Sequence, residues 1–280
     1  MKHLYLNLKR FDVPVEYGGV NRLAPLDDWA QKIIKGTQEG LKPFENEAEF
    51  VMFFPELHLL NAKKALIPGS PVKVGCQGIY RMDTAVGGNF GAFTANRPAS
   101  AMKAAGVEQV LIGHCEERND KAGILQEAGV SDPDAVNRIL NEEILRAQAR
   151  GFKVLYCIGE KEEELPDKEN VLRKQLEIGL KDADKSNIVI GYEPVWSIGP
   201  GKTPAGKDYI TEIARLVKDI TGGMDVVYGG GLKQDNAEML ASIPEIDGGL
   251  IALTRFTGEI GFYPEEYLEI VDLYLKGCVK

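Results

Sequence analysis

The sequence GYEPVWSIGPGKTP at residues 191–204 decides the fold, because it joins a buried strand to a short, hinged loop. The residues Ile188–Tyr192 are apolar and β-branched and lack a helical period, which predicts a strand. Glu193 follows that strand, a proline fixes the backbone after it, and Gly199 and Gly201 add flexibility. A carboxylate under an apolar loop that excludes water suits proton abstraction. The alternative is an ordinary strand-to-helix loop with a surface glutamate.

Short apolar strands alternate with amphipathic helical stretches along the whole chain. The expected strands are residues 3–8, 50–54, 72–76, 107–112, 153–158, 188–192, 225–228 and 248–252. The expected helices are residues 27–36, 56–66, 100–105, 133–150, 170–181, 208–221, 235–241 and 264–276.

Eight strand–helix units with no break in composition predict a parallel sheet closed as a (β/α)8 barrel, with residues 1–280 as a single domain. An open doubly wound sheet is the alternative, but no Gly-x-Gly-x-x-Gly motif follows the first strand. Ser131 with Asp134 predicts a capping box for the longest helix, and Gly151 predicts its C-terminal cap.

Polar or glycine-rich motifs follow several other expected strands. Asn7 and Lys9 end the first strand, His114 follows the fourth, and glycines 229–231 follow the seventh. The carboxyl ends of barrel strands surround one mouth, which is where barrels build active sites. We therefore expect Asn7, Lys9, His114, Glu193 and glycines 229–231 to converge at one mouth of the barrel.

These motifs, in this order, resemble those of the triosephosphate isomerase family along nearly the whole chain: Asn-x-Lys, Gly-His-x-Glu, Tyr-Glu-Pro-Val-Trp-x-Ile-Gly-x-Gly-Lys and Tyr-Gly-Gly. The resemblance implies a TIM barrel that interconverts dihydroxyacetone phosphate and glyceraldehyde 3-phosphate through an enediolate, with no metal and no cofactor. It implies that Glu193 moves the proton and that a neutral His114 acts on the substrate oxygens. Lys9 and Asn7 would then stabilise the enediolate oxygen. Glu116 would orient the pocket or hold Lys9.

The same residues also have purely structural interpretations. His114 is then a satisfied structural histidine, Lys9 a solvated lysine, and residues 229–231 turn glycines. A barrel that binds a ligand without catalysis is a second function class, which the presence of the full catalytic quartet disfavours. A lyase with Lys9 as a Schiff-base residue is a third, but no neighbouring lysine or local cation explains an uncharged amine there.

The resemblance places the substrate phosphate beside backbone N–H groups at the last two strands and the loop after the sixth. The expected binding residues are Gly199, Gly231, Ala252, Leu253 and Arg255. Gly231 stands where the family has serine, and Ala252-Leu253 where it has a Gly-Gly pair, so Leu253 adds bulk beside a dianion. Arg255 either compensates with charge-assisted donors or is a surface arginine. These departures motivate the alternative of another small phosphorylated ketose, such as a tetrose phosphate.

Residues 80–90 form a longer loop than in the family, where the loop reaches the active site of a partner subunit through a threonine like Thr84. The resemblance therefore predicts a homodimer. The family's Glu–Arg pair across the interface cannot form, because Asn96 and Glu117 occupy its positions. Cys115 replaces a family serine.

Composition limits the class of partner. The net charge of -9 and the pI of about 5.1 argue against nucleic acid and against an anionic membrane surface. Four cysteines without a close pair indicate neither a zinc site nor a disulfide framework, and suit the cytoplasm. The N-terminus shows no signal peptide, and no apolar run is long enough to span a bilayer. We therefore expect a cytoplasmic protein with a small phosphorylated sugar as its substrate.

Overall fold

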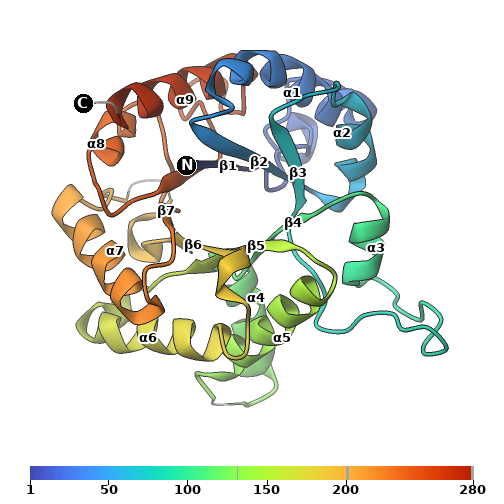
Figure 1. The fold of residues 1–280 in the computed structure, drawn as a ribbon, viewed down its shortest axis with the longest axis vertical. Coiled ribbons are helices and arrows are strands. Elements are labelled where there is room, and N and C mark those ends of the chain that lie inside the picture. The colour runs from blue at the N-terminus through green and yellow to red at the C-terminus, as the bar shows by residue number, and fades with distance from the viewer. Residues whose placement is uncertain (131, 200–201, 279–280) are drawn as a thin grey trace. The chain divides into compact units, whose positions relative to one another are not determined.

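The computed structural model describes residues 1–130, 132–199 and 202–278, and its strands confirm the predicted (β/α)8 TIM barrel (Figure 1). Hydrogen bonds link the strands as a closed barrel in the order β1-β2-β3-β4-β5-β6-β7-β8. The strands are β1 (Lys2–Asn7), β2 (Ala48–Phe54), β3 (Val72–Cys76), β4 (Gln109–Ile112), β5 (Lys153–Ile158), β6 (Ile188–Tyr192), β7 (Val226–Tyr228) and β8 (Gly248–Ile251).

The eight expected helices are present with shifted ends, and one further helix appears. The helices are α1 (Leu26–Leu41), α2 (Leu59–Ala65), α3 (Ala99–Ala104), α4 (Cys115–Glu127), α5 (Ala135–Ala149), α6 (Lys168–Gly179), α7 (Lys207–Thr221), α8 (Ala237–Ala241) and α9 (Pro264–Cys278). Helix α4 is not predicted over its length from the sequence, because it buries none of its residues and has no apolar face. Among the described residues, no helix is long and apolar enough to cross a membrane.

The end of α5 agrees with its prediction, whereas its start is tested only in part. Asp134 directly precedes α5 and makes no side-chain capping hydrogen bond, and its expected partner Ser131 lies outside the described residues. Gly151 follows the cap residue with φ +74°, and its N–H donates to the carbonyl of Gln148 at 2.9 Å. Glycine tolerates this left-handed conformation, so the helix ends there.

The chain forms two compact units, and the first combines Met1–Gln77 with Val227–Lys280. In this unit β1 pairs in parallel with β2 and β8, and β2 pairs with β3. Helix α8 packs on α9, α9 on α1, and α1 on α2. A Cβ at Gly40 of α1 would lie 2.6 Å from Cδ1 of Leu268 on α9, so the leucine side chain would have to shift to admit one.

The second unit comprises Gly78–Val226. Its strands β4, β5 and β6 pair in parallel, and α4, α5, α6 and α7 pack on one another in that order. The ring of Tyr156 is fully buried and its hydroxyl donates to the carbonyl of Gln175 at 2.8 Å. A Cβ at Gly179 would lie 2.0 Å from that hydroxyl, so only glycine lets α6 cover β5 this closely.

Candidate active site

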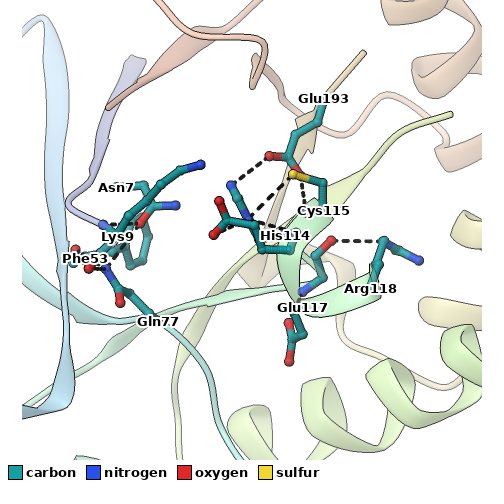
Figure 2. Close-up of polar contacts among 11 residues, drawn as sticks. Asn7, Lys9, Phe53, Gln77, His114, Cys115, Glu117, Arg118 and Glu193 are labelled. Carbon is teal, nitrogen blue, oxygen red and sulfur yellow. Dashed lines mark hydrogen bonds and ion pairs between the residues drawn. The ribbon is translucent and has the colours of Figure 1, made fainter. Parts of the chain in front are cut away.

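The carboxylate of Glu193 is buried at the end of β6 and is held from two directions (Figure 2). The Nε2 atom of His114 lies 3.0 Å from its Oε1 atom, and the backbone N–H of Cys115 donates to its Oε2 atom at 2.9 Å. Glu193 is 2% exposed and His114 is 7% exposed. The structure thus brings together two of the predicted catalytic residues, from strands β6 and β4.

The hydrogen bonds of His114 identify its tautomer. His114 is the N-terminal cap of α4, and its Nδ1 atom accepts the backbone N–H of Glu116 at 3.3 Å. A backbone N–H can only donate, so Nδ1 carries a lone pair and the ring proton sits on Nε2, facing Glu193. This geometry fits the expected neutral imidazole. The carboxylate of Glu116 is mostly exposed, and its Oε2 atom lies 3.7 Å from Nδ1.

Tight glycine contacts fix the backbone around this pair. Gly113 has φ +82°, and a Cβ there would lie 2.7 Å from the carbonyl oxygen of Cys157. A Cβ at Gly159 would lie 1.8 Å from the carbonyl oxygen of Glu193. The side-chain amide of Gln175 holds Gly159 in place. Its Oε1 atom accepts the N–H of Gly159 at 2.9 Å, and its Nε2 atom donates to the carbonyl of Gly159 at 2.8 Å. Gly159 and Gln175 are not among the site residues predicted from the sequence.

The loop after β6 is anchored through a buried acid that the sequence analysis also missed. Glu160 is 0% exposed, and its Oε1 atom accepts from Trp196 at 2.8 Å, from the hydroxyl of Tyr192 at 2.9 Å and from that of Tyr209 at 2.8 Å. Burial and the neighbouring Glu160 carboxylate raise the pKa of Tyr192. The hydrogen bond to Glu160 therefore holds Trp196, and with it the start of the predicted lid, in place.

The predicted lid is described over only part of its length. Val195–Ser197 forms a single 3-10 turn, and Gly199 follows it with φ +119°. The next residues of the predicted lid, Pro200 and Gly201, lie outside the described residues.

In the first unit, Asn7 and Lys9 are held by Gln77, which directly follows β3 (Figure 2). The Nε2 atom of Gln77 lies 3.2 Å from Oδ1 of Asn7 and 3.1 Å from each of the carbonyl oxygens of Lys9 and Phe53. The same Oδ1 atom accepts the backbone N–H of Lys9 at 3.0 Å. Lys9 has φ +39°, which is strained for a residue with a side chain and points to a functional constraint. The sequence pattern used for Asn7, Lys9 and His114 also marks Gln77, because it is a polar residue directly after an expected strand.

The predicted phosphate-binding residues of the first unit lie on two loops that are joined by a hydrogen bond. The N–H of Leu232 donates to the carbonyl of Leu250 at 3.0 Å, which ties the loop after β7 to β8. Gly231 has φ +95°, a conformation that disfavours the serine of the family. Ala252 and Leu253 are half-buried directly after β8.

Arg255 has firm partners in its own loop and in the first turn of α9. Its Nε atom donates to Oε1 of Glu266 at 2.7 Å, Nη2 contacts the same oxygen, and the guanidinium lies 3.9 Å from the ring centroid of Tyr263. Arg255 also forms an antiparallel bridge with Gly261. Its contact with a phosphate stays a prediction.

A partly buried charge cluster supports the turn that carries His114. The Oε2 atom of Glu117 accepts the N–H of Gly113 at 2.6 Å, and the ammonium of Lys121 lies 2.8 Å from Glu117 and 3.1 Å from Glu143. Burial, and then repulsion by Glu117, raise the pKa of Glu143 to about 8. Burial alone would also raise the pKa of Glu117, but the Lys121 ammonium lowers it.

Comparison with known proteins gives one consistent family. The family model described as triosephosphate isomerase matches residues 26–263. A triosephosphate isomerase of Chlorobium luteolum is 36% identical over 209 residues, which cover 70% of this chain and 76% of the relative. One of Synechocystis sp. is 28% identical over 246 residues, covering 87% and 91%. The crystal structure of triosephosphate isomerase from Bartonella henselae has a TM-score of 0.72 at 25% identity and covers 98% of each chain.

The raised pKa of Glu143 predicts how stability depends on pH. Between the ordinary value of 4.5 and about 8, the folded protein keeps a proton on Glu143 that the unfolded chain releases, so the free energy of unfolding falls as pH rises. Glutamine mimics the protonated acid. We therefore expect Glu143→Gln to match the wild type near pH 4.5 and to become relatively more stable toward pH 8, by up to about 1.4 kcal/mol per pH unit. Urea unfolding across this range measures the difference, and parallel curves for the two proteins would contradict the assignment.

Proposed function

Because the chain belongs to the triosephosphate isomerase family, we propose that it interconverts dihydroxyacetone phosphate and glyceraldehyde 3-phosphate. One observation carries the proposal: the buried carboxylate of Glu193 lies 3.0 Å from Nε2 of His114, whose Nδ1 atom accepts the N–H of Glu116. The reaction moves one proton between adjacent carbons and needs a base for carbon and an acid for oxygen. This pair supplies both without a redox cofactor.

In the proposed mechanism Glu193 takes a proton from C1 of dihydroxyacetone phosphate. The electrons of the C–H bond form the C1–C2 double bond, and the C2 carbonyl oxygen takes the proton of Nε2 from His114. Return of the carbon-bound proton to C2, with loss of the O1 proton to His114, gives the aldehyde. Every atom of the substrate is retained, as an isomerisation requires.

The roles of Asn7 and Lys9 follow from the family resemblance. The Oδ1 atom of Asn7 already accepts from Gln77 and from the backbone of Lys9, which leaves the Nδ2 group as a donor for a substrate oxygen. The ammonium of Lys9 would stabilise the negative charge that develops in the enediolate. Its strained backbone is consistent with a position that is set by function.

The proposed phosphate ligands are the N–H groups of Gly199, Gly231, Ala252 and Leu253. Leu253 leaves its N–H in place but brings an apolar side chain to a charged group, which is unfavourable. The second candidate substrate is therefore another small phosphorylated ketose, such as a tetrose phosphate. The departure of this loop from the family motivates that candidate.

The first prediction from the proposed function tests the proton transfer. We expect NMR to show conversion of the triose phosphates by the wild type, and Glu193→Asp to lower kcat by about 100-fold with little change in KM. Shortening the side chain withdraws the carboxylate by roughly 1 Å. Glu163→Asp makes the same change at an exposed position and serves as the matched control. Turnover at the wild-type rate in Glu193→Asp would remove this residue from the mechanism.

A second prediction concerns the phosphate end of the substrate. If Arg255 binds phosphate, Arg255→Ala raises KM several-fold on triose and tetrose phosphates, whereas a role limited to holding Glu266 lowers only the free energy of unfolding. Steady-state kinetics with thermal unfolding separates these results.

Leu253→Gly restores the family residue. If this variant shows no gain in kcat/KM with triose phosphate, Leu253 is not what separates the substrate preference of this chain from that of its family.

We further propose a homodimeric, cytoplasmic enzyme whose residues 1–280 form one domain. The long loop offers exposed apolar side chains, with Val86 fully exposed and Phe90 90% exposed, as expected for an unpaired interface. The four thiols suit a reducing compartment.

A third prediction concerns assembly. Sedimentation velocity is expected to give a dimer for the wild type and a shift toward monomer for Val86→Asp, because a buried unpaired carboxylate is costly. Leu60→Asp changes an exposed leucine of α2 and is the control. A fully active wild-type monomer would refute the dimer.

A further inference from the structure

A thiol lies beside the proposed acid and base, at a position where the family has serine. One potential ligand atom from each of His114, Cys115 and Glu193 lies within 4.8 Å of the other two. The Sγ atom of Cys115 is 3.8 Å from Nδ1 of His114, and both side chains adjoin the Glu193 carboxylate (Figure 2). In the part of the chain that the structure describes, this is the one group of three or more such ligands.

The ligand types define the metal that fits. Imidazole, thiolate and carboxylate together suit Zn²⁺, whereas Mg²⁺ and Ca²⁺ prefer oxygen ligands alone. In a tetrahedral zinc site the ligand atoms are separated by about 3.3–3.6 Å, as follows from metal–ligand distances of about 2.0–2.3 Å. The widest separation must therefore close by roughly 1 Å, which rotation of the Cys115 side chain can supply.

We propose that His114, Cys115 and Glu193 form an inhibitory binding site for Zn²⁺ or another thiophilic divalent cation. Inhibition by the metal rests on the proposed function, because the metal would bind the base and the acid of the isomerisation. Metal binding itself does not depend on that function. Three protein ligands leave the fourth position to water.

Protons and charge balance in this site. Binding forms one metal bond each to sulfur, nitrogen and oxygen, and the thiol proton of Cys115 leaves to solvent. Nε2 of His114 becomes the metal ligand, and its ring proton moves to Nδ1. Nδ1 then gives up the hydrogen bond that it accepts from the N–H of Glu116 and donates toward the Glu116 carboxylate, whose Oε2 atom now lies 3.7 Å away and has to move closer. One thiolate and one carboxylate neutralise the divalent cation. This neutrality offsets the unfavourable field that the N-terminus of α4 exerts on a cation.

A cavity provides an entry path to the thiol. Its volume is about 330 Å³, and Cys115, Gly159 and Val195 line it on the side of the candidate site. The carboxylates of Asp134, Glu164 and Asp167 also line this cavity, together with Arg118 and two lysines. A hydrated cation can therefore reach Cys115, which is itself half-buried, without unfolding the strand ends.

Cobalt is the probe that tests the site directly. Metal-stripped wild-type protein, kept reduced with a phosphine, is titrated with Co²⁺, and a thiolate-to-cobalt charge-transfer band is the expected result. The affinity for Zn²⁺ is measured by competition with a chromophoric chelator. Cys115→Ser is expected to lose the band and to weaken Zn²⁺ binding at least about tenfold.

The control variants separate this site from nonspecific thiol binding. Cys278→Ser changes another half-buried cysteine and should keep both the band and the affinity, while Cys76 and Cys157 are buried. Thermal unfolding without metal checks that Cys115→Ser is folded, and Cys115→Ala provides a second test if it is not. A wild-type protein without the band, or equal Zn²⁺ affinity in wild type and both Cys115 variants, would overturn the proposal.

The activity arm distinguishes the failure of each proposal. Zn²⁺ should inhibit triose phosphate turnover competitively, with an inhibition constant equal to the measured Kd and reversal by chelator, while millimolar Mg²⁺ should not. Turnover that persists at saturating Zn²⁺ would overturn the inhibitory site. A charge-transfer band that depends on Cys115, in a protein without turnover on any sugar phosphate, would support the metal site and reject only the isomerase assignment.

Discussion

The hydrogen bond from the backbone N–H of Cys115 to Glu193 is the interaction on which the candidate site depends. It connects the first turn of α4 to the end of β6, and its length is 2.9 Å. The donor is a backbone group whose position is set by the Gly113 turn, which Glu117 in turn holds. A buried carboxylate that lacked such donors would be costly, so the strand ends and the helix start have to be correct together. The burial of Glu193 therefore depends on the whole turn from Gly113 to Glu117.

Most of the fold could be predicted because strand and helix periods are local properties of the sequence. The expected ranges 72–76, 153–158 and 188–192 agree with the observed strands β3, β5 and β6. Helix α4 was missed over its length for a physical reason. It buries none of its residues, so no apolar stripe marks it, and its start is recognisable only through the capping by His114. Tertiary contacts, not periodicity, keep this helix in place.

The candidate site could be predicted where a reactive side chain follows a strand, and the structure places Asn7, His114 and Glu193 at such positions. Gln77 also directly follows a strand, but the distant partners of such residues could not be found in this way. Gln77 is 70 residues from Asn7, and Glu160 is 49 residues from Tyr209, so no local pattern reveals either contact. Both are polar groups that satisfy several partners at once. Buried polar groups need hydrogen-bond partners, and only the folded structure shows which groups Gln77 and Glu160 satisfy.

The same distinction between backbone and side chain explains how a thiol is compatible with the candidate site. The group that holds Glu193 is the N–H of Cys115, which any non-proline residue provides. The side chain of residue 115 does not take part in this hydrogen bond. It can therefore differ from the family serine without moving the Glu193 carboxylate. Cysteine spacing along the sequence indicated no metal site, because the third ligand lies 78 residues away, on another strand end. The barrel brings the β4 and β6 ends together within one unit, so in the proposed site a single change from oxygen to sulfur alters which cations are attracted, while the N–H of Cys115 remains available to Glu193.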